Sequence, residues 1–497
     1  MNNIRITRHH EILRSNNSRV IIRPFVPADP QRVVTIIGRA LALSEIEVDA
    51  ELAAVRARFQ TRHRDFDAQL RTVYTKVEPH VFTHRQISSN RLLLIGSLFA
   101  GEYSIEAAAL FNPSIVPHPD QSGVPEGSLR FIMSLRATGE GHISSIEFRT
   151  GTIHQDGRIG LDPASPFATV PEEKSDPSYK KRRFLIKLHE MNFAEENISA
   201  VMAPLPESFT RGELNHSVEL ARLENLTGRK GLHRTLDFIQ WLADSNYEIS
   251  FGTDTGLGER TIFPVSGNES HGIEDARFVR FTEPDGSVMY YATYTAYNGK
   301  STLPQLIETE DFRQFRVLTL NGCAIRNKGM ALFPRRIGGK YVMLSRQDDE
   351  NLLIMCSPSP HYWSTPKVLL RPTHVWEAVK LGNCGSPVET EAGWLVITHG
   401  VGPMRRYCIG AILLDLEDPT RVIGRLREPL LEPGDSDRDG YVPNVVYSCG
   451  SLVHGGQLIL PFATNDHSSV IATVSLDDLL RKLLESPPFV NGSQVNR

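Results

Sequence analysis

A repeat of strand-like segments constrains the fold of this 497-residue chain more than any other feature. Four segments share one plan, in which a glycine-containing turn leads into an alternating apolar strand, a short polar stretch and a second strand. They begin at Asp285, Gly338, Ala392 and Gly455. The plan therefore recurs roughly every 50–60 residues, a period typical of blades or arrays rather than of a sandwich. A weaker fifth copy covers 127–136, with 143–149 as its partner strand.

Five such units closed into a ring make a five-bladed β-propeller, in which loops from every blade meet at a central channel. The sequence therefore predicts a mainly β fold of this kind with two helical additions, because apolar residues recur at three-to-four spacing in 29–79 and again within 165–245. The predicted division is 1–105 as an N-terminal helical extension, 106–164 as the first propeller blade, 165–245 as a helical insertion, 246–485 as the remaining blades and 486–497 as a C-terminal tail.

The charge of the chain is close to balanced, with 54 Lys and Arg against 58 Asp and Glu. This balance gives no general field for nucleic acid or an anionic membrane, so we expect neither as a partner. The longest apolar run, 92–100, is too short to cross a bilayer, and 1–23 lacks the apolar stretch of a signal peptide. Five cysteines without a Cys-x-x-Cys pair favour reduced thiols and a cytoplasmic location.

Familiar ligand-binding motifs are weak in this sequence. The glycine-rich stretch 252–258 opens no convincing βαβ unit, so a dinucleotide or phosphate loop is not predicted there. The acidic stretch that begins at Asp435 resembles the start of a calcium loop, but Val446 stands where the closing Glu is required. We therefore predict no metal site and no organic cofactor.

Ionisable residues recur at the ends of the predicted strands. They are Glu274, Asp275, Lys328, Arg346, Lys380, His399 and Asp466. Taken singly, each has a structural interpretation, such as a surface cation or an ion pair between Asp275 and Arg277. Taken jointly, their repeated placement predicts one central cluster of carboxylates, cations and a histidine.

Four motifs resemble those of glycoside hydrolase family 130, which contains β-mannoside phosphorylases and β-1,2-mannosidases on a five-bladed propeller. The motifs are 272–278, with its Glu-Asp-Ala-Arg core, 331–346, 393–400 and 440–446. The resemblance covers about 110–160 and 246–485. It does not explain the two helical additions, which we interpret as sites through which the chain could form a homo-oligomer.

The resemblance implies a role for each site residue. Asp275 matches the catalytic acid, which protonates the glycosidic oxygen through a mannose hydroxyl. Lys328, Arg346 and Lys380 match the phosphate-binding positions, and His399, close by in the order of the motifs, is assigned to phosphate with them. The remaining matches, to groups that bind the sugar, are Asn112, Arg136, Glu274 and Asp466. Inorganic phosphate is then a co-substrate that needs no protein base, because it arrives as an anion held by cations.

The leading hypothesis is an inverting phosphorylase that converts a β-1,2- or β-1,4-linked manno-oligosaccharide and phosphate to α-mannose 1-phosphate. A β-mannosidase of the same family and a non-catalytic carbohydrate-binding propeller remain open, since fold alone does not establish catalysis. The chain departs from the phosphorylases at 347–350, where Gln-Asp-Asp-Glu follows Arg346 in place of a frequent proline, and at Cys384 and Ser386. We interpret these departures as changes on the acceptor side.

Overall fold

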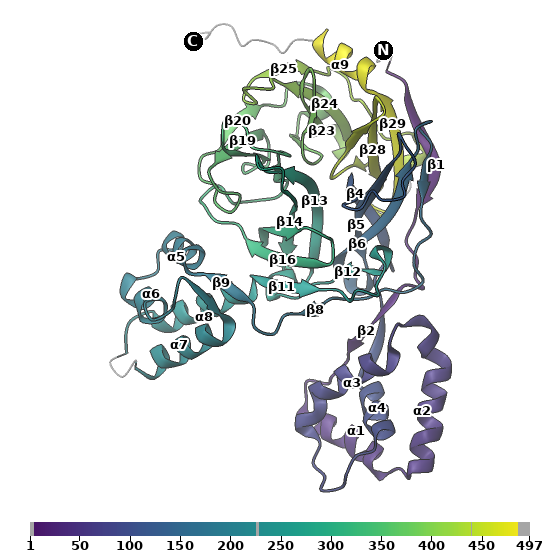
Figure 1. Ribbon diagram of the computed structural model, residues 1–497, viewed down its shortest axis with the longest axis vertical. Helices are drawn as coiled ribbons and strands as arrows, with labels where there is room; N and C mark the ends of the chain where they lie inside the picture. Colours follow the sequence, from purple (N-terminus) through teal and green to yellow (C-terminus); the bar gives the residue numbers. More distant parts are fainter. Residues whose placement is uncertain (1–3, 225–227, 439, 486–497) are drawn as a thin grey trace.

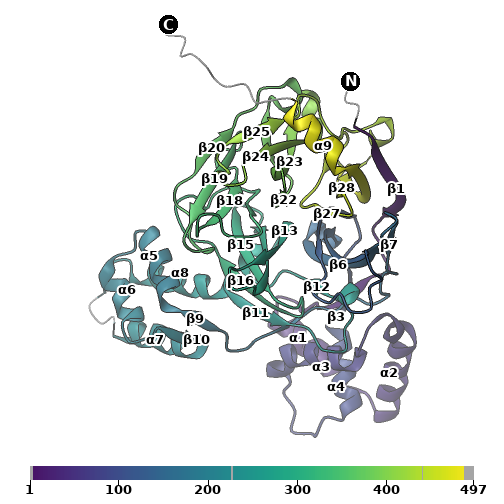
Figure 2. The same cartoon turned by 45° about the horizontal axis from the view of Figure 1, so that its top comes forward.

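The computed structural model describes residues 4–224, 228–438 and 440–485. A body of β-sheets occupies the upper part of Figure 1, and two separate helical units lie below it and to its lower left. Figure 2 shows the same arrangement after a turn of the molecule. The predicted C-terminal tail, 486–497, lies outside the described residues. None of the described helices combines the length and the apolar character that crossing a bilayer requires.

The largest sheet has the order β4-β5-β6-β13-β14-β15-β16-β11-β8, with β7 and β12 also paired to β6. Its strands are β4 (Ala109–Pro117), β5 (Leu129–Thr138), β6 (Ser144–Ile153), β7 (Ile159–Leu161), β8 (Glu172–Glu173), β11 (Tyr247–Ser250), β12 (Thr261–Ile262), β13 (Gly272–Thr282), β14 (Val288–Tyr297), β15 (Thr302–Thr309) and β16 (Gln314–Thr319). A single parallel pair, Gly272 with Ser144, joins β13 to β6. The sheet therefore consists of two antiparallel halves that meet at one point.

Three further sheets continue the β body along the chain. The first contains β17 (Ala331–Leu332), β18 (Tyr341–Ser345), β19 (Leu352–Ser357) and β20 (Lys367–Leu370). The second contains β21 (Lys380–Asn383), β22 (Val388–Thr390), β23 (Gly393–Val401), β24 (Tyr407–Leu414) and β25 (Val422–Arg425). The third contains β26 (Val446–Tyr447), β27 (Leu452–His454), β28 (Gln457–Thr464), β29 (Ser468–Ser475) and β1 (Ile6–Leu13). The repeated strands of the sequence are found as β5, β14, β18, β23 and β28.

The first strand differs from the expectation that 1–105 forms a helical extension. Strand β1 pairs antiparallel with β29 and so belongs to the last sheet of the β body. Its sequence, Ile-Thr-Arg-His-His-Glu-Ile-Leu, is mostly exposed and polar. An edge strand of this composition has no apolar alternation by which to predict it.

The N-terminal helical unit contains four helices and a two-stranded sheet. They are α1 (Pro30–Ala42), α2 (Glu45–Phe59), α3 (Phe66–Val77), α4 (Ser89–Leu98), β2 (Val20–Pro24) and β3 (Ala100–Ser104). Asp29 caps α1, with proline at the first helical position, and a capping box of Ser44 and Glu47 begins α2. The apolar faces meet in a core that includes Val33, Ile37 and Phe99.

The second helical unit has its own core. Its elements are β9 (Ser178–Lys180), α5 (Lys181–Glu190), α6 (Glu195–Met202), β10 (Ser208–Thr210), α7 (Arg211–Leu223) and α8 (Leu232–Asp244). Phe184, Val218 and Leu236 are among the residues buried in this core. A last helix, α9 (Leu476–Leu484), packs Leu479 and Leu483 against the sheets that contain β24 and β28.

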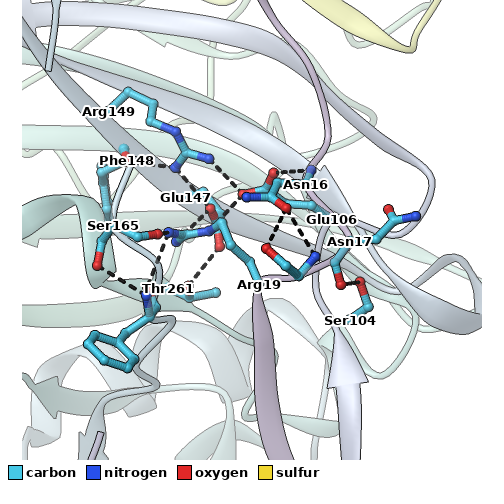
Figure 3. Close-up of polar contacts among 12 residues, drawn as sticks. Asn16, Asn17, Arg19, Ser104, Glu106, Glu147, Phe148, Arg149, Ser165 and Thr261 are labelled. Carbon is cyan, nitrogen blue, oxygen red and sulfur yellow. Dashed lines mark hydrogen bonds and ion pairs between the residues drawn. The ribbon is translucent and has the colours of Figure 1, made fainter. Parts of the chain in front are cut away.

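A fully buried ion cluster fixes the N-terminal helical unit to the β body. Figure 3 shows Arg19, which precedes β2, beside Glu106 and Glu147, with Arg149 on their other side. The Arg19 guanidinium lies 2.9 Å from Glu106 and 3.0 Å from Glu147, and the Arg149 guanidinium lies 2.6 Å and 3.0 Å from the same carboxylates. Burial and the charge of Glu147 raise the pKa of Glu106 to about 8, whereas Arg19 and Arg149 outweigh burial and hold the pKa of Glu147 well below its usual range. Near neutral pH Glu147 therefore carries the negative charge of this pair of carboxyl groups, and Glu106 holds a proton.

Candidate active site

Asp275 and Asn112 lie at β-bulges in two strands that run side by side near the middle of the β body, β13 and β4 (Figure 1). The pairing register shifts between Glu274 and Arg277 in β13 and between Phe111 and Ser114 in β4. Asp275 has a φ of 56° and Asn112 a φ of 50°, a left-handed conformation that costs energy in a side-chain-bearing residue. The bulges turn the two side chains together, and Asn112 Nδ2 donates to Asp275 Oδ1 over 2.7 Å.

Cations surround the buried carboxylate of Asp275. Arg136 Nη1 lies 3.4 Å from Asp275 Oδ1, and the charges of Arg277 and Lys328 also act on it. Burial alone would raise the pKa of Asp275, but these cations and the hydrogen bond from Asn112 outweigh burial and hold the pKa below its usual range. Asp275 is therefore ionised at neutral pH in the free protein.

Glu274 binds two of the same cations. Its Oε1 accepts from Arg136 Nη2 over 2.7 Å, and its Oε2 accepts from Lys328 Nζ over 2.5 Å. Lys328, which the resemblance assigns to phosphate, thus lies against Glu274 on the Asp275 side of the site. We call Asn112, Arg136, Glu274, Asp275 and Lys328 the acid cluster.

Asp466 is a third carboxyl group of the site, and it interacts through its charge with Asp275 and Arg136 of the acid cluster. It has a φ of 51° in the hairpin between β28 and β29. Burial and the negative charge of Asp275 raise the pKa of Asp466 to about 6, although Arg136 and Arg405 act in the opposite direction. Two neighbouring carboxyl groups with pKa values pushed apart are a common arrangement in acid–base sites.

A second group, here called the cation cluster, contains Arg346, Lys380, His399 and Asp349. Arg346 Nη1 donates to His399 Nε2 over 2.9 Å, while His399 Nδ1 lies 3.1 Å from the carbonyl oxygen of Asn383. Nδ1 therefore carries the proton and Nε2 is the acceptor. Burial, with the charges of Arg346 and Arg277, holds the pKa of His399 well below its usual range, so the imidazole is neutral.

His399 is only 1% exposed and lies behind the Arg346 guanidinium. His399 is thus placed to orient Arg346. A glycine at 382 makes room for this contact, because a Cβ there would lie 2.5 Å from His399 Cε1 and 3.4 Å from Arg346 Cδ. The geometry explains why the strand pair β21 and β23 needs glycine at this position.

Asp349 lies between the two cations of this cluster. Its Oδ2 accepts from Lys380 Nζ over 2.8 Å, and its Oδ1 lies 3.5 Å from Arg346 Nη2. The sequence marks it only as part of an acidic stretch. Its role as a partner of these cations could not be foreseen, because it depends on a left-handed turn with a φ of 61°.

Arg277 connects the two clusters and is absent from the residues that the sequence assigns to the site. Its Nη1 donates to the backbone oxygen of Asp275 over 3.1 Å, and its Nη2 donates to the Tyr447 hydroxyl over 2.6 Å. The Tyr447 ring lies 4.9 Å from the His399 ring, edge to face. The Glu-Asp-Ala-Arg motif contains this arginine, and the bulge at Asp275 is the feature that gives it a central position.

The structure therefore brings the nine predicted site residues together in two adjoining groups. Asn112, Arg136, Glu274, Asp275 and Lys328 form the acid cluster, with Asp466 acting on it through its charge. Arg346, Lys380 and His399 belong to the cation cluster. The chemical roles assigned to them stay predictions.

The site thus joins paired carboxyl groups to a neighbouring pair of cations in a mainly β body. In a sequence comparison, the family described as beta-1,4-mannooligosaccharide phosphorylase matches residues 244–485. The chain belongs to glycoside hydrolase family 130, a family of enzymes. Asn112 and Arg136 lie outside the matched residues, and the structure brings them to the site from β4 and β5.

Among known proteins, the chain is similar to the 1,2-beta-oligomannan phosphorylase of Thermoanaerobacter sp. (strain X514), with 36% identity over 231 residues, 44% of this chain and 74% of that protein. It is also similar to the beta-1,2-mannobiose phosphorylase of Listeria innocua, with 27% identity over 327 residues, 64% of this chain and 84% of that protein. The solved structure of a Listeria innocua beta-1,2-mannobiose phosphorylase with beta-1,2-mannobiose gives a TM-score of 0.43 at 21% identity, over 77% of this chain and 93% of that one.

Proposed function

We propose that the protein is an inverting mannoside phosphorylase, which cleaves a β-mannoside with inorganic phosphate to give α-mannose 1-phosphate and a shortened sugar. The observation that carries this proposal is the convergence of Arg346 and Lys380 on one carboxylate, that of Asp349. Two cations that hold a carboxylate through separate oxygens can hold phosphate in the same way. A hydrolase has little use for such a pair, because it must activate water instead.

The proposed reaction is a single displacement at C1 of the mannosyl group. A phosphate oxygen forms the new bond from one face while the bond to the glycosidic oxygen breaks on the other face, and the departing oxygen takes a proton. Asp275 is the proposed source of that proton, relayed through a mannose hydroxyl. Asp275 is ionised in the free protein, and phosphate bound near its cations would offset their charge and raise its pKa toward protonation.

The sugar itself is proposed to bind in the acid cluster. Asn112, Arg136, Glu274 and Asp466 offer donors and acceptors of the kind that mannose hydroxyls require. In this scheme Arg346, Lys380 and Lys328 bind phosphate, and His399 orients Arg346. The proposed substrate is a β-1,2- or β-1,4-linked manno-oligosaccharide, since both linkages occur in the names of the matched family and relatives. No metal or organic cofactor is part of the proposed reaction.

The β body is proposed to be a five-bladed propeller. Its largest sheet divides into two antiparallel halves at the Gly272–Ser144 pair, which together with the other three sheets makes five units. We keep the division into extension, first blade, insertion and remaining blades as a proposal, with β1 assigned to the last blade. The helical units are proposed contacts for a homo-oligomer, and we propose a cytoplasmic protein with neither nucleic acid nor membrane as a partner.

Product analysis tests the proposed reaction. The protein is incubated with β-1,2-mannobiose and with β-1,4-mannobiose, each with and without inorganic phosphate. We expect the disaccharide to disappear only when phosphate is present. Release of mannose without phosphate would instead identify a β-mannosidase, and no cleavage of any mannoside would favour a carbohydrate-binding protein.

A further inference from the structure

The carboxylate of Asp349 occupies the space between the two cations that are proposed to bind phosphate. Its two oxygens face different cations, at 2.8 Å from Lys380 Nζ and 3.5 Å from Arg346 Nη2. Two oxygens of a bound phosphate would make the same pair of contacts. Asp349 and phosphate therefore cannot both hold these positions.

The turn between β18 and β19 aims Asp349 at the cations. Asp348 Oδ1 accepts from the backbone N–H groups of Glu350 and Asn351, at 3.0 Å and 2.9 Å, and so forms the turn by itself. Asp349 takes the left-handed conformation that such a turn requires, with a φ of 61°, where glycine or asparagine fits equally well. The Asp349 side chain is thus not needed to make the turn.

Asp349 is also the most easily displaced member of this ion group. Its side chain is 53% exposed, against 21% for Lys380 and 11% for Arg346. Rotation of the carboxylate into water breaks the ion pairs with Lys380 and Arg346 and a hydrogen bond with Asn327. Ion pairs that include an exposed partner are individually weak. Arg346 would stay in place, because it donates to the buried ring of His399.

Asp349 carries its negative charge at neutral pH. Burial would raise its pKa, but the hydrogen bond from Lys380 and the charge of Arg346 hold the pKa below its usual range. The contact is therefore one between full charges, as the contact with phosphate would be.

We propose that Asp349 is an internal anion that competes with inorganic phosphate for Arg346 and Lys380, so that its displacement sets the affinity of the protein for phosphate. This inference rests on the proposed function and adds Asp349 as a residue that controls phosphate binding. The apparent affinity for phosphate is reduced by the fraction of molecules in which Asp349 covers the cations. Removing the charge of Asp349 should raise that affinity.

The test is a calorimetric titration of the full-length protein with inorganic phosphate at neutral pH, without any sugar. Asp349→Asn keeps the shape of the side chain, Asp349→Gly removes it, and both suit a positive φ. We expect each variant to bind phosphate about three- to tenfold more tightly than the parent protein. Glu350→Gln removes an equal charge one residue away, from a side chain that pairs with no described residue, and should leave the affinity unchanged.

Unchanged or weaker phosphate binding by both Asp349 variants would overturn the inference. An equal gain in phosphate affinity in Glu350→Gln would overturn it too. Weaker binding would mean that Asp349 holds the cations in position for phosphate. The same titration showing no phosphate binding by any of the proteins would overturn it as well. Tighter phosphate binding by the Asp349 variants, in a protein that cleaves no mannoside, would uphold the inference and reject the proposed reaction. Phosphate-dependent cleavage of a mannoside, with the phosphate affinity unchanged in the variants, would uphold the proposed reaction and reject the inference.

Discussion

At the scale of single residues, the site is defined by side chains whose charge depends on their neighbours. Asp275 and Asp466 are both partly or fully buried carboxyl groups, yet the pKa of one is lowered and that of the other is raised. The cations lie closest to Asp275, so Asp275 keeps the negative charge, and Asp466 experiences that charge in addition to burial. Position within the cluster, rather than residue type, decides which carboxyl group can hold a proton near neutral pH.

The raised pKa of Asp466 predicts a pH dependence of stability. With a pKa of about 6 in the folded state, Asp466 keeps a proton that the unfolded chain has lost, so its contribution is full below about pH 4 and is lost as pH rises through about 6. Asp466→Asn should remove about 2 kcal/mol of the difference in unfolding free energy between acid and neutral pH. Urea unfolding of both proteins between pH 4 and 7.5 measures this, and parallel curves would show that Asp466 does not titrate in this range.

His399 predicts a separate effect on phosphate. Replacing it by leucine leaves Arg346 without its buried acceptor, so the guanidinium loses its fixed direction. We expect KM for phosphate to rise about tenfold while KM for the mannoside changes much less. His399→Gln supplies another acceptor and should restore part of the loss; equal rises in both KM values would indicate a general structural role instead.

At the scale of elements, the β-bulges and one strand junction carry the geometry of the site. Gly272 joins β13 to β6 with a φ of 133°, and a Cβ there would lie 2.7 Å from the backbone nitrogen of Ser144. Gly272→Ala should therefore lower the unfolding free energy by about 2 kcal/mol or more. It should also displace the acid cluster, because Glu274 of that cluster follows two residues later. Gly38→Ala in α1, where the added Cβ meets nothing within 4 Å, should instead stabilise by roughly 0.5–1 kcal/mol. Chemical denaturation of both variants makes the comparison, and equal behaviour would contradict the role given to the junction.

The sequence predicts strands well where apolar alternation is regular and poorly where polar residues form an edge. The repeated strands β14, β18, β23 and β28 are found where the glycine-turn plan places them, whereas the sequence assigns the polar strand β1 to the helical extension. Bulges shift register by one residue without any change in composition. For that reason the motif around Asp275 indicates the site, but not that Asn112 binds Asp275 or that Arg277 joins the two clusters.

At the scale of the whole molecule, long-range ion clusters join parts that are far apart in the chain. Arg19, Glu106 and Glu147 are separated by dozens of residues, so no local pattern predicts that they meet (Figure 3). The same holds for Asp349 and Lys380 in the site. The repeat could be predicted because it lies within each segment, while these contacts exist only once the sheets are assembled.

The buried cluster predicts how firmly the N-terminal helical unit is attached. Arg19→Met removes the buried ion pair with Glu147 and the hydrogen bonds that the backbone oxygens of Ser165 and Phe167 accept, and should lower the unfolding free energy by about 3–5 kcal/mol. Arg158→Met breaks an exposed ion pair with Asp156 and should leave the unfolding midpoint almost unchanged. Denaturant unfolding followed by circular dichroism compares the two, and a similar small effect of both would contradict the structural role of the cluster.

The central claim is that the mannosyl group is transferred to a phosphate held by Arg346 and Lys380. The most direct measurement is a nuclear magnetic resonance time course of the protein with β-1,2-mannobiose or β-1,4-mannobiose in phosphate buffer, observing phosphorus and the anomeric proton. The account predicts that one disaccharide yields α-mannose 1-phosphate as the first product, and that Arg346→Ala abolishes its formation at low phosphate concentration. Free mannose as the first product, or mannose 1-phosphate formed first as the β anomer, would contradict it.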